Sequence, residues 1–168
     1  MQPLHRQRGV AAIEFAFVFP LFFVILYAIV AYSLILLANM AISGATQEGA
    51  RAALANPPGM TTLATQYSQR MSNACLRASS LATWLTTQAP TTTCPESTCS
   101  SGSASCLTVS QAACGPSNAM VCITVAMSYD YASHPIVPNL PLLGFVTPKT
   151  LGATSTVQLD PASVMSNM

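Results

Sequence analysis

The feature that most constrains this chain is a long stretch near its start that carries no charge. Residues 15–47 contain no Asp, Glu, Lys or Arg, and the segment from Phe15 to Leu37 is apolar almost throughout. As an α-helix, this segment would extend about 35 Å at about 1.5 Å per residue, enough to cross a hydrocarbon core about 30 Å thick. Such a segment must close its backbone hydrogen bonds internally, so the pattern predicts a transmembrane helix that Pro20 bends slightly.

Basic residues just before the apolar segment indicate its orientation. His5, Arg6 and Arg8 precede it, and positively charged flanks stay on the cytoplasmic side of a membrane. A cleaved secretory signal would have a shorter apolar stretch, of about 7–15 residues, and an A-x-A-like exit, which residues 37–40 do not provide. We therefore predict a single-pass anchor with a cytoplasmic N-terminus and a C-terminal domain outside the membrane.

Composition and motifs argue against several classes of function. Only 7% of the residues are charged and the formal net charge is +1, so the chain lacks the clustered Lys and Arg that nucleic acid binding needs. Ser128, Asp130 and His134 lie close in sequence, but Pro135 follows the histidine, so helical geometry cannot be assumed and nothing marks a nucleophile arrangement. With no Gly-rich phosphate loop and no paired carboxylates, we predict no enzymatic activity, no cofactor and no nucleic acid partner.

The cysteines all follow the apolar segment, and they are Cys75, Cys94, Cys99, Cys106, Cys114 and Cys122. An even number on one side of a membrane span favours disulfide bonds formed in an oxidising compartment. The sequence does not choose among the possible pairings. Because the spacings contain no C-x2-C knuckle, a zinc site is much less favoured, and we predict no bound metal.

One acidic residue interrupts the apolar pattern at the membrane entrance. Glu14 lies five residues after Gly9, and a carboxylate at this depth costs free energy unless it stays near the interface or finds a positive partner. One interpretation is that Glu14 only reaches to the interface. The alternative is that cleavage after Gly9 frees the amino group of Val10, one helical turn away on the same face. That amine would pair with Glu14 of its own chain or of a neighbour.

These residues also carry a resemblance to a known family. The stretch Arg8-Gly9-Val10-Ala11-Ala12-Ile13-Glu14-Phe15 resembles a type IVb prepilin processing signal, and more closely the TadE-like pseudopilins of the tight-adherence (Flp) pilus system. In that family a basic leader ends in Gly, small residues follow, and Glu is the fifth residue of the mature chain. A Glu-Gly-Ala-Arg motif is typical after the span and here occupies residues 48–51. The family often has Tyr where this chain has Phe15. The resemblance is strong over residues 6–55 and loose beyond.

The resemblance implies that a prepilin peptidase cuts between Gly9 and Val10. It implies a minor pseudopilin of the bacterial inner membrane that helps to assemble the pilus, possessing a leader at residues 1–9, a helix at 10–55 and a periplasmic head at 60–168. The implied partners are the peptidase, other pilins and pseudopilins, the inner-membrane pilus assembly platform and membrane lipid. The alternative is an uncleaved single-pass envelope protein whose outer domain binds a ligand or a surface.

The first helix is expected to continue beyond the membrane to about Ala55. Asn56-Pro57-Pro58-Gly59 then stops it, because Pro cannot continue a helix. Since glycine is costly inside a helix unless a close approach requires it, Gly44 and Gly49 favour packing against a partner helix. The expected packing stripe consists of small residues at helical spacing, and they are Ala41, Ala45, Gly49 and Ala52.

Periodicity predicts an amphipathic helix over residues 61–87. Its apolar stripe consists of Leu63, Tyr67, Met71, Cys75, Ala78, Leu81 or Ala82, and Leu85, with Arg70 and Arg77 off the stripe. Residues 86–118 are rich in Ser, Thr, Cys, Pro and Gly and cannot bury enough apolar surface to fold unaided. We expect disulfides of Cys94, Cys99, Cys106 and Cys114 to hold this stretch in place.

Alternation predicts a strand at residues 120–131 and a second at 153–159, paired like a hairpin. The connection at 135–148 is rich in proline. It is expected to cover the sheet or to form an exposed contact patch through Leu140, Leu142, Leu143 and Phe145. The predicted fold class is therefore α+β, in which a long transmembrane helix precedes a small disulfide-bonded periplasmic domain with an amphipathic helix and a few antiparallel strands.

Overall fold

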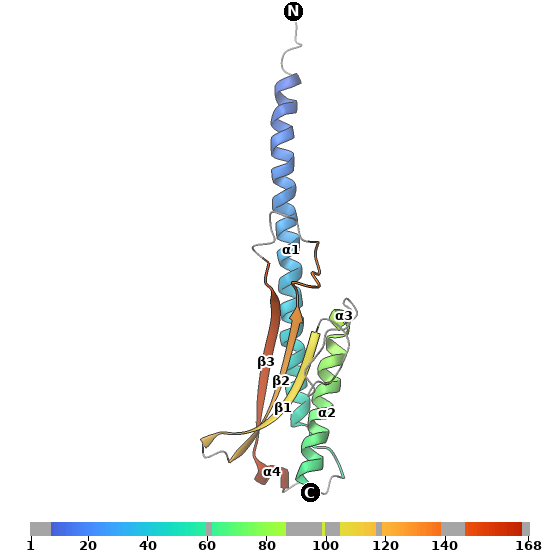
Figure 1. The fold of residues 1–168 in the computed structure, drawn as a ribbon, viewed down its shortest axis with the longest axis vertical. Helices are drawn as coiled ribbons and strands as arrows, with labels where there is room; N and C mark the ends of the chain where they lie inside the picture. The colour runs from blue at the N-terminus through green and yellow to red at the C-terminus, as the bar shows by residue number, and fades with distance from the viewer. Residues whose placement is uncertain are drawn as a thin grey trace, which may run out of the picture. The chain divides into compact units, whose positions relative to one another are not determined.

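The computed structural model contains four helices and three strands in the part of the chain that it describes (Figure 1). The described residues are 8–59, 62–86, 99, 105–116, 119–138 and 147–165. The chain divides into two compact units, Met1–Leu36 and Leu37–Met168. The predicted α+β class is confirmed, because a long apolar helix precedes a unit of helices and antiparallel strands.

Helix α1 runs from Arg8 to Leu54 and contains Pro20. It ends within one residue of the predicted position, immediately before the Asn-Pro-Pro-Gly sequence. Gly59 then adopts a positive φ of 77°, a conformation that costs glycine little and other residues more. The helix therefore ends for the reason that its sequence predicts.

A three-stranded antiparallel sheet forms the second half of the chain, in the order β1-β2-β3. Strand β2, Met120–Asp130, is central and pairs with β1, Ser105–Cys114, and with β3, Thr150–Leu159. The predicted pairing of residues 120–131 with 153–159 is confirmed. The apolar residues expected in the proline-rich connection (Leu140, Leu142, Leu143 and Phe145) lie outside the described residues.

Strand β1 lies within residues 86–118, where the sequence predicted no strand. Ten residues, Ser105–Cys114, pair with β2 without interruption. Leu107 and Val109 are buried at 2% and 3% exposure, whereas the rest of the strand is small or polar. With so little apolar surface of its own, β1 is stabilised by its pairing with β2, which local composition does not reveal.

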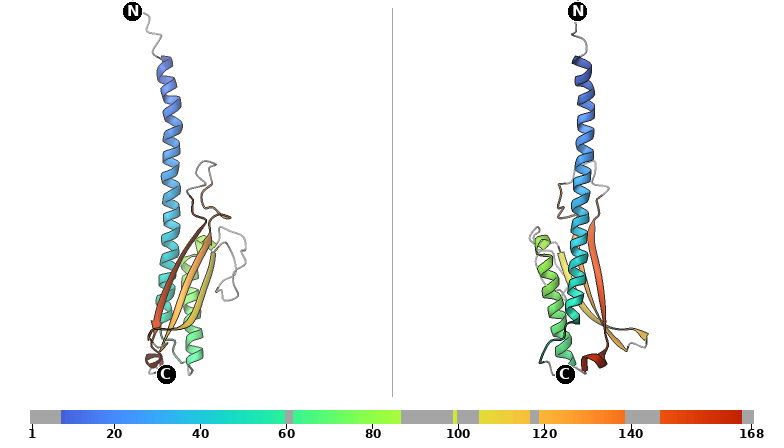
Figure 2. Two further views of the ribbon diagram at one scale, coloured as in Figure 1. Left: turned by 60° about the vertical axis from the view of Figure 1, so that its left-hand side comes forward. Right: turned by 180° about the vertical axis from the view of Figure 1, so that it is seen from behind.

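One face of the sheet forms the core of the second unit. The alternate residues Ile123, Val125, Met127 and Tyr129 of β2 are exposed by 3% or less, as their spacing predicts. Helix α2, Leu63–Leu81, and the second half of α1 run along this face (Figure 2). The short helices are α3, Thr83–Thr86, and α4, Pro161–Met165. No described helix covers the opposite face of the sheet.

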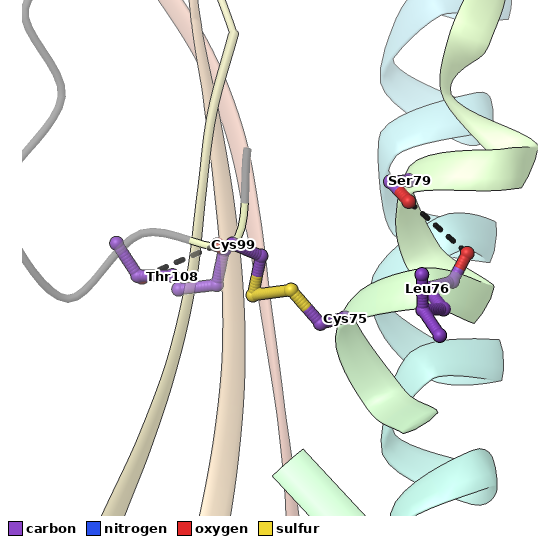
Figure 3. The surroundings of a disulfide bond; sticks show 6 residues. Cys75, Leu76, Ser79, Cys99 and Thr108 are labelled. Carbon is purple, nitrogen blue, oxygen red and sulfur yellow. Dashed lines mark hydrogen bonds between the residues drawn. A yellow bond between two sulfur atoms is a disulfide. The ribbon is translucent and has the colours of Figure 1, made fainter. Parts of the chain in front are cut away.

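Two disulfide bonds are found among the described residues of this unit, so the predicted disulfide bonding is confirmed. Cys75 of α2 bonds to Cys99, whose backbone N–H donates to the carbonyl oxygen of Leu107 on β1 at 3.0 Å (Figure 3). Cys114 bonds to Cys122 and links β1 to β2. Of the other two candidates, Cys94 and the side chain of Cys106 lie outside the described part of the chain.

Candidate functional site

The first candidate site is the start of α1. The helix begins at Arg8, so Gly9, Val10 and Glu14 all lie on it. Val10 and Glu14 are four residues apart and therefore share a helical face. The Glu14 side chain is exposed and makes no ion pair or hydrogen bond with any described side chain. A carboxylate is thus carried without a partner at the edge of an apolar surface.

The apolar surface that follows Glu14 surrounds α1 on all sides. Phe17, Val18 and Leu21 are exposed by 78%, 62% and 62%, and the other large apolar side chains from Ile13 to Leu37 are similarly open, except that Ile35 is buried. A helix that is hydrophobic all round belongs in an apolar medium. By length and composition, the helix over Ala11–Leu54 is suited to crossing a membrane, with a mean hydropathy of 2.7 in its most apolar window.

Stacked aromatic side chains and a hydrogen-bonded serine hydroxyl are also compatible with a lipid environment around this segment. Phe15, Phe19 and Phe23 follow one another along one face, with ring centroids 5.1 and 4.7 Å apart. Ser33 donates its hydroxyl to the Ile29 carbonyl oxygen at 2.7 Å, so this polar group needs no water. The N-terminal apolar helix indicates a single-pass membrane protein.

The second candidate site is the small-residue stripe on the outer half of α1. Ala45 is 1% exposed and Gly49 is buried, whereas Ala41 and Ala52 are half-buried. A Cβ atom added at Gly49 would lie 2.9 Å from the Ala78 Cβ and 3.0 Å from the Ala74 carbonyl oxygen. The helix that approaches Gly49 is therefore α2 of the same chain.

Gly44 lies on the opposite, open side of α1. No atom would come within 4 Å of a Cβ added there, and the neighbouring Met40 is 69% exposed. On the same outer surface, Arg51 donates to Glu48 at 2.8 Å. This pair is well exposed and contributes only a few tenths of a kcal/mol.

Arg70 corrects the prediction that it lies off the buried stripe of α2. Its side chain is only 3% exposed. The Nη1 atom donates to the carbonyl oxygens of Ala53 and Leu54 at 3.1 and 2.9 Å, and Nη2 donates to Asn56 Oδ1 at 2.9 Å. The last carbonyls of a helix have no partner within that helix. Arg70 supplies the missing donors, so its burial follows from where α1 ends.

Arg70 therefore joins α2 to the end of α1 through charge-assisted hydrogen bonds. Burial lowers the pKa of its guanidinium from the ordinary value, and the nearby Tyr67 raises it. Gln66 and Tyr67 are buried beside Arg70 in sequence, at 1% and 7% exposure. Sequence periodicity selects apolar residues, so it identified Tyr67 and missed Gln66 and Arg70.

Replacing Arg70 by methionine should lower the free energy of unfolding of this unit by about 3 kcal/mol. The substitution keeps an unbranched buried chain but leaves one buried and one partly buried carbonyl oxygen without the donor that Arg70 provides. The measurement is urea unfolding of the purified chain, followed by the fluorescence of its one tryptophan, Trp84. Arg77→Met is the control because Arg77 is exposed, and it should change the value by no more than about 0.5 kcal/mol. Equal losses in both variants would contradict the assigned role.

The residues around His134 form a closed turn. The Tyr129 hydroxyl donates to the His134 carbonyl oxygen at 2.8 Å, and the Ser133 N–H donates to Asp130 Oδ1 at 3.2 Å. Burial raises the pKa of Tyr129, and the hydrogen bonds from Ser133 lower that of Asp130. The His134 Nδ1 atom is buried without a hydrogen-bond partner. The hydrogen bonds made by Tyr129 and Ser133 stabilise the turn, and neither involves Ser128.

The described side chains contain no group of three or more His, Cys, Asp and Glu that could hold a metal ion.

Comparison with known proteins identifies the first part of the chain. Residues 9–51 match the model of the family described as TadE-like protein, which confirms the resemblance that the motifs of this segment predict. The match ends within α1, before α2 and the sheet. Neither the comparison with curated proteins nor the comparison with solved structures gave a match. The family match and the apolar helix fit a membrane protein related to tight-adherence pili.

Proposed function

We propose that this chain, whose residues 9–51 are TadE-like, is a minor pseudopilin that takes part in assembling tight-adherence pili. It is anchored in the inner membrane by α1, with its N-terminus in the cytoplasm and its head in the periplasm. Its role is structural: it helps to build the pilus without forming most of it. Any cutting of the chain is the chemistry of a prepilin peptidase, for which this protein is the substrate.

The observation that carries the proposal is the position of one carboxylate. Glu14 lies within the TadE-like segment, at the start of a helix whose apolar side chains are exposed on all sides. Cleavage between Gly9 and Val10 would create an amine one turn away on the same face. Pairing of this amine with Glu14, in the same chain or in a neighbour, would neutralise both charges in the apolar medium.

We assign a separate role to each part of the chain. Residues 1–9 are removed, and residues 10–55 insert into the membrane and pack against neighbouring helices. The head, residues 60–168, selects partners among other pilins, pseudopilins and the assembly platform. The open side of α1 around Met40 and Gly44 is the side on which a neighbouring helix would dock. Gly44 supports this, because a glycine inside a helix costs about 1 kcal/mol relative to alanine, and no described atom of its own chain would lie within 4 Å of a Cβ added there.

Mass spectrometry of the membrane-extracted chain tests the processing step. We expect a mature N-terminus at Val10 in cells that contain an active prepilin peptidase, and an intact Met1 in cells without it. Since the chain remains anchored after cleavage, both forms should fractionate with the inner membrane. An intact Met1 in the presence of the peptidase would contradict processing and favour an uncleaved envelope protein.

A further inference from the structure

The sheet leaves one complete edge open. Strand β3 pairs with β2 over ten consecutive residues, from Thr150 to Leu159, without a bulge. In the described part of the chain, no hydrogen bond joins β3 to any strand or helix other than β2. Among the described residues, the outward row of backbone N–H and C=O groups along β3 therefore has no hydrogen-bond partner.

This edge lacks the usual protection against pairing with another strand. Natural edge strands are commonly short, charged, broken by proline or bulged. The sequence of β3 is Thr-Leu-Gly-Ala-Thr-Ser-Thr-Val-Gln-Leu, which contains neither charge nor proline. Alternate residues on its two faces are exposed or only half-buried between Gly152 and Gln158. An uncharged extended strand of another molecule could therefore add to it through main-chain hydrogen bonds.

The opposite edge, on β1, offers a suitable partner strand. β1 is also uncharged, and its sequence is Ser-Cys-Leu-Thr-Val-Ser-Gln-Ala-Ala-Cys. Among the described residues, only Cys99 bonds to its outer edge, at Leu107, which leaves the stretch from Thr108 to Cys114 open. A hollow of about 610 Å³ lined partly by Met71, Val109 and Ala113 borders this stretch. It leaves room beside β1 for side chains of an added strand.

The directions of the edge strands determine how the sheets of two copies can pair, and this step rests on the proposed anchoring of both copies in one membrane. β1 and β3 are both antiparallel to β2, so they run parallel to each other. Two chains anchored in one membrane point the same way, which allows β3 of one copy to pair in parallel with β1 of the next. An antiparallel pair of two β3 strands would invert one copy. A parallel pair of two β3 strands would place the helix-covered face of one sheet beside the open face of the other.

We propose that heads of this chain join edge to edge, with β3 of one copy pairing in parallel with β1 of a second copy. The resulting sheet is continuous, and α1 and α2 of every copy lie on the same side. The contact is heterologous, because it joins two different edges of the sheet. It therefore leaves one unpaired edge at each end of the assembly and can extend to further copies. On the open face, the small uncharged residues of β3 and β1 meet without like-charge repulsion.

Single lysines on the open face of the sheet give matched test variants. Thr154→Lys adds a charge to β3, Ser110→Lys adds one to β1, and Ser128→Lys adds one to the central strand β2. All three side chains are exposed, so each variant should fold with a stability within about 0.5 kcal/mol of the original chain. Only the first two place a charge on a pairing edge, where it disfavours strand addition.

The experiment is native mass spectrometry of the full chain in detergent over a range of concentrations. We expect the original chain and Ser128→Lys to form dimers and larger species, and Thr154→Lys or Ser110→Lys alone to associate at least about tenfold more weakly, equivalent to about 1.4 kcal/mol. An equimolar mixture of these two should restore one-to-one dimers without larger species, because each supplies the edge that the other lacks. Hydrogen exchange of β1 and β3 amides should slow in the assemblies.

Three outcomes would overturn the proposal. The first is an original chain that stays monomeric at every concentration, and the second is a mixture of Thr154→Lys and Ser110→Lys that fails to pair. The third is a Ser110→Lys variant that dimerises by itself, which would indicate pairing between two β3 strands. None of these readouts depends on cleavage at Gly9. A monomeric chain with Val10 as its N-terminus would contradict the edge contact and leave the pseudopilin proposal standing. Mixed dimers of a chain that is not cleaved at Gly9 would support the edge contact and contradict processing as a pseudopilin.

Discussion

Alanine in place of Glu14 should reduce the number of assembled pili by about a hundredfold while leaving cleavage after Gly9 intact. Cleavage depends on the leader and the bond after Gly9, which the substitution does not touch. Assembly in the proposed mechanism requires a partner for the amine of Val10 inside an apolar contact. Removing one member of a buried ion pair costs about 3–5 kcal/mol, and about 1.4 kcal/mol corresponds to a factor of ten.

Two measurements separate these effects. Mass spectrometry reports the N-terminus of the variant, and electron microscopy counts pili on cells that express it in place of the original chain. Glu14→Asp is the matched control, because it keeps the carboxylate within reach of the first turn, and it should retain most of the pili. Pilus numbers that stay unchanged in Glu14→Ala would exclude Glu14 from the assembly mechanism.

The sequence predicts those parts of the fold that local pattern alone determines. The charge-free run at residues 15–47 leaves no alternative to a long apolar helix, and the Asn-Pro-Pro-Gly sequence ends it where the structure does. Strand β2 alternates between apolar and polar or small residues because one of its faces is buried against helices, so its core residues could be predicted from the sequence. In each case the signal lies within one element.

The features that the sequence did not predict depend on contacts between distant segments. Among the residues of β1 whose burial is described, 107–114, Leu107 and Val109 alone are buried, so pairing with β2 provides most of the stabilisation of this strand. Arg70 is buried because α1 happens to end beside it and needs donors. A pattern of apolar residues cannot show that a charge is buried, because burial here follows from hydrogen bonding to another helix.

The small residues of α1 show what helical spacing can and cannot predict. Their spacing predicted a close helical neighbour, and for Gly49 that neighbour is α2, through Ala74 and Ala78. The spacing cannot tell whether a partner helix belongs to the same chain or to another. The two glycines of this region differ accordingly, since Gly49 faces the interior and Gly44 faces open space. They provide a natural pair for measuring what the contact contributes.

Valine in place of Gly49 should lower the free energy of unfolding of the second unit by about 3 kcal/mol, the upper part of the range for overpacking. Its Cβ alone would lie 2.9 Å from the Ala78 Cβ, 3.0 Å from the Ala74 carbonyl oxygen and 3.3 Å from Val125 Cγ1. Two of these atoms belong to the closely packed α2 and cannot rotate away, so α2 must move from α1. That movement would also lengthen the hydrogen bonds that Arg70 makes to the end of α1.

Gly44→Val is the control, because the same substitution is made in the same helix with nothing within 4 Å. Valine and glycine differ only modestly in helix propensity, so Gly44→Val should change stability by about 0.5 kcal/mol or less. Urea unfolding of both purified variants, followed through Trp84, measures the difference. Equal stabilities would mean that α1 and α2 are not held in close contact at Gly49. A Gly44→Val chain that folds normally but assembles few pili would instead locate the intermolecular helix contact on the open side of α1.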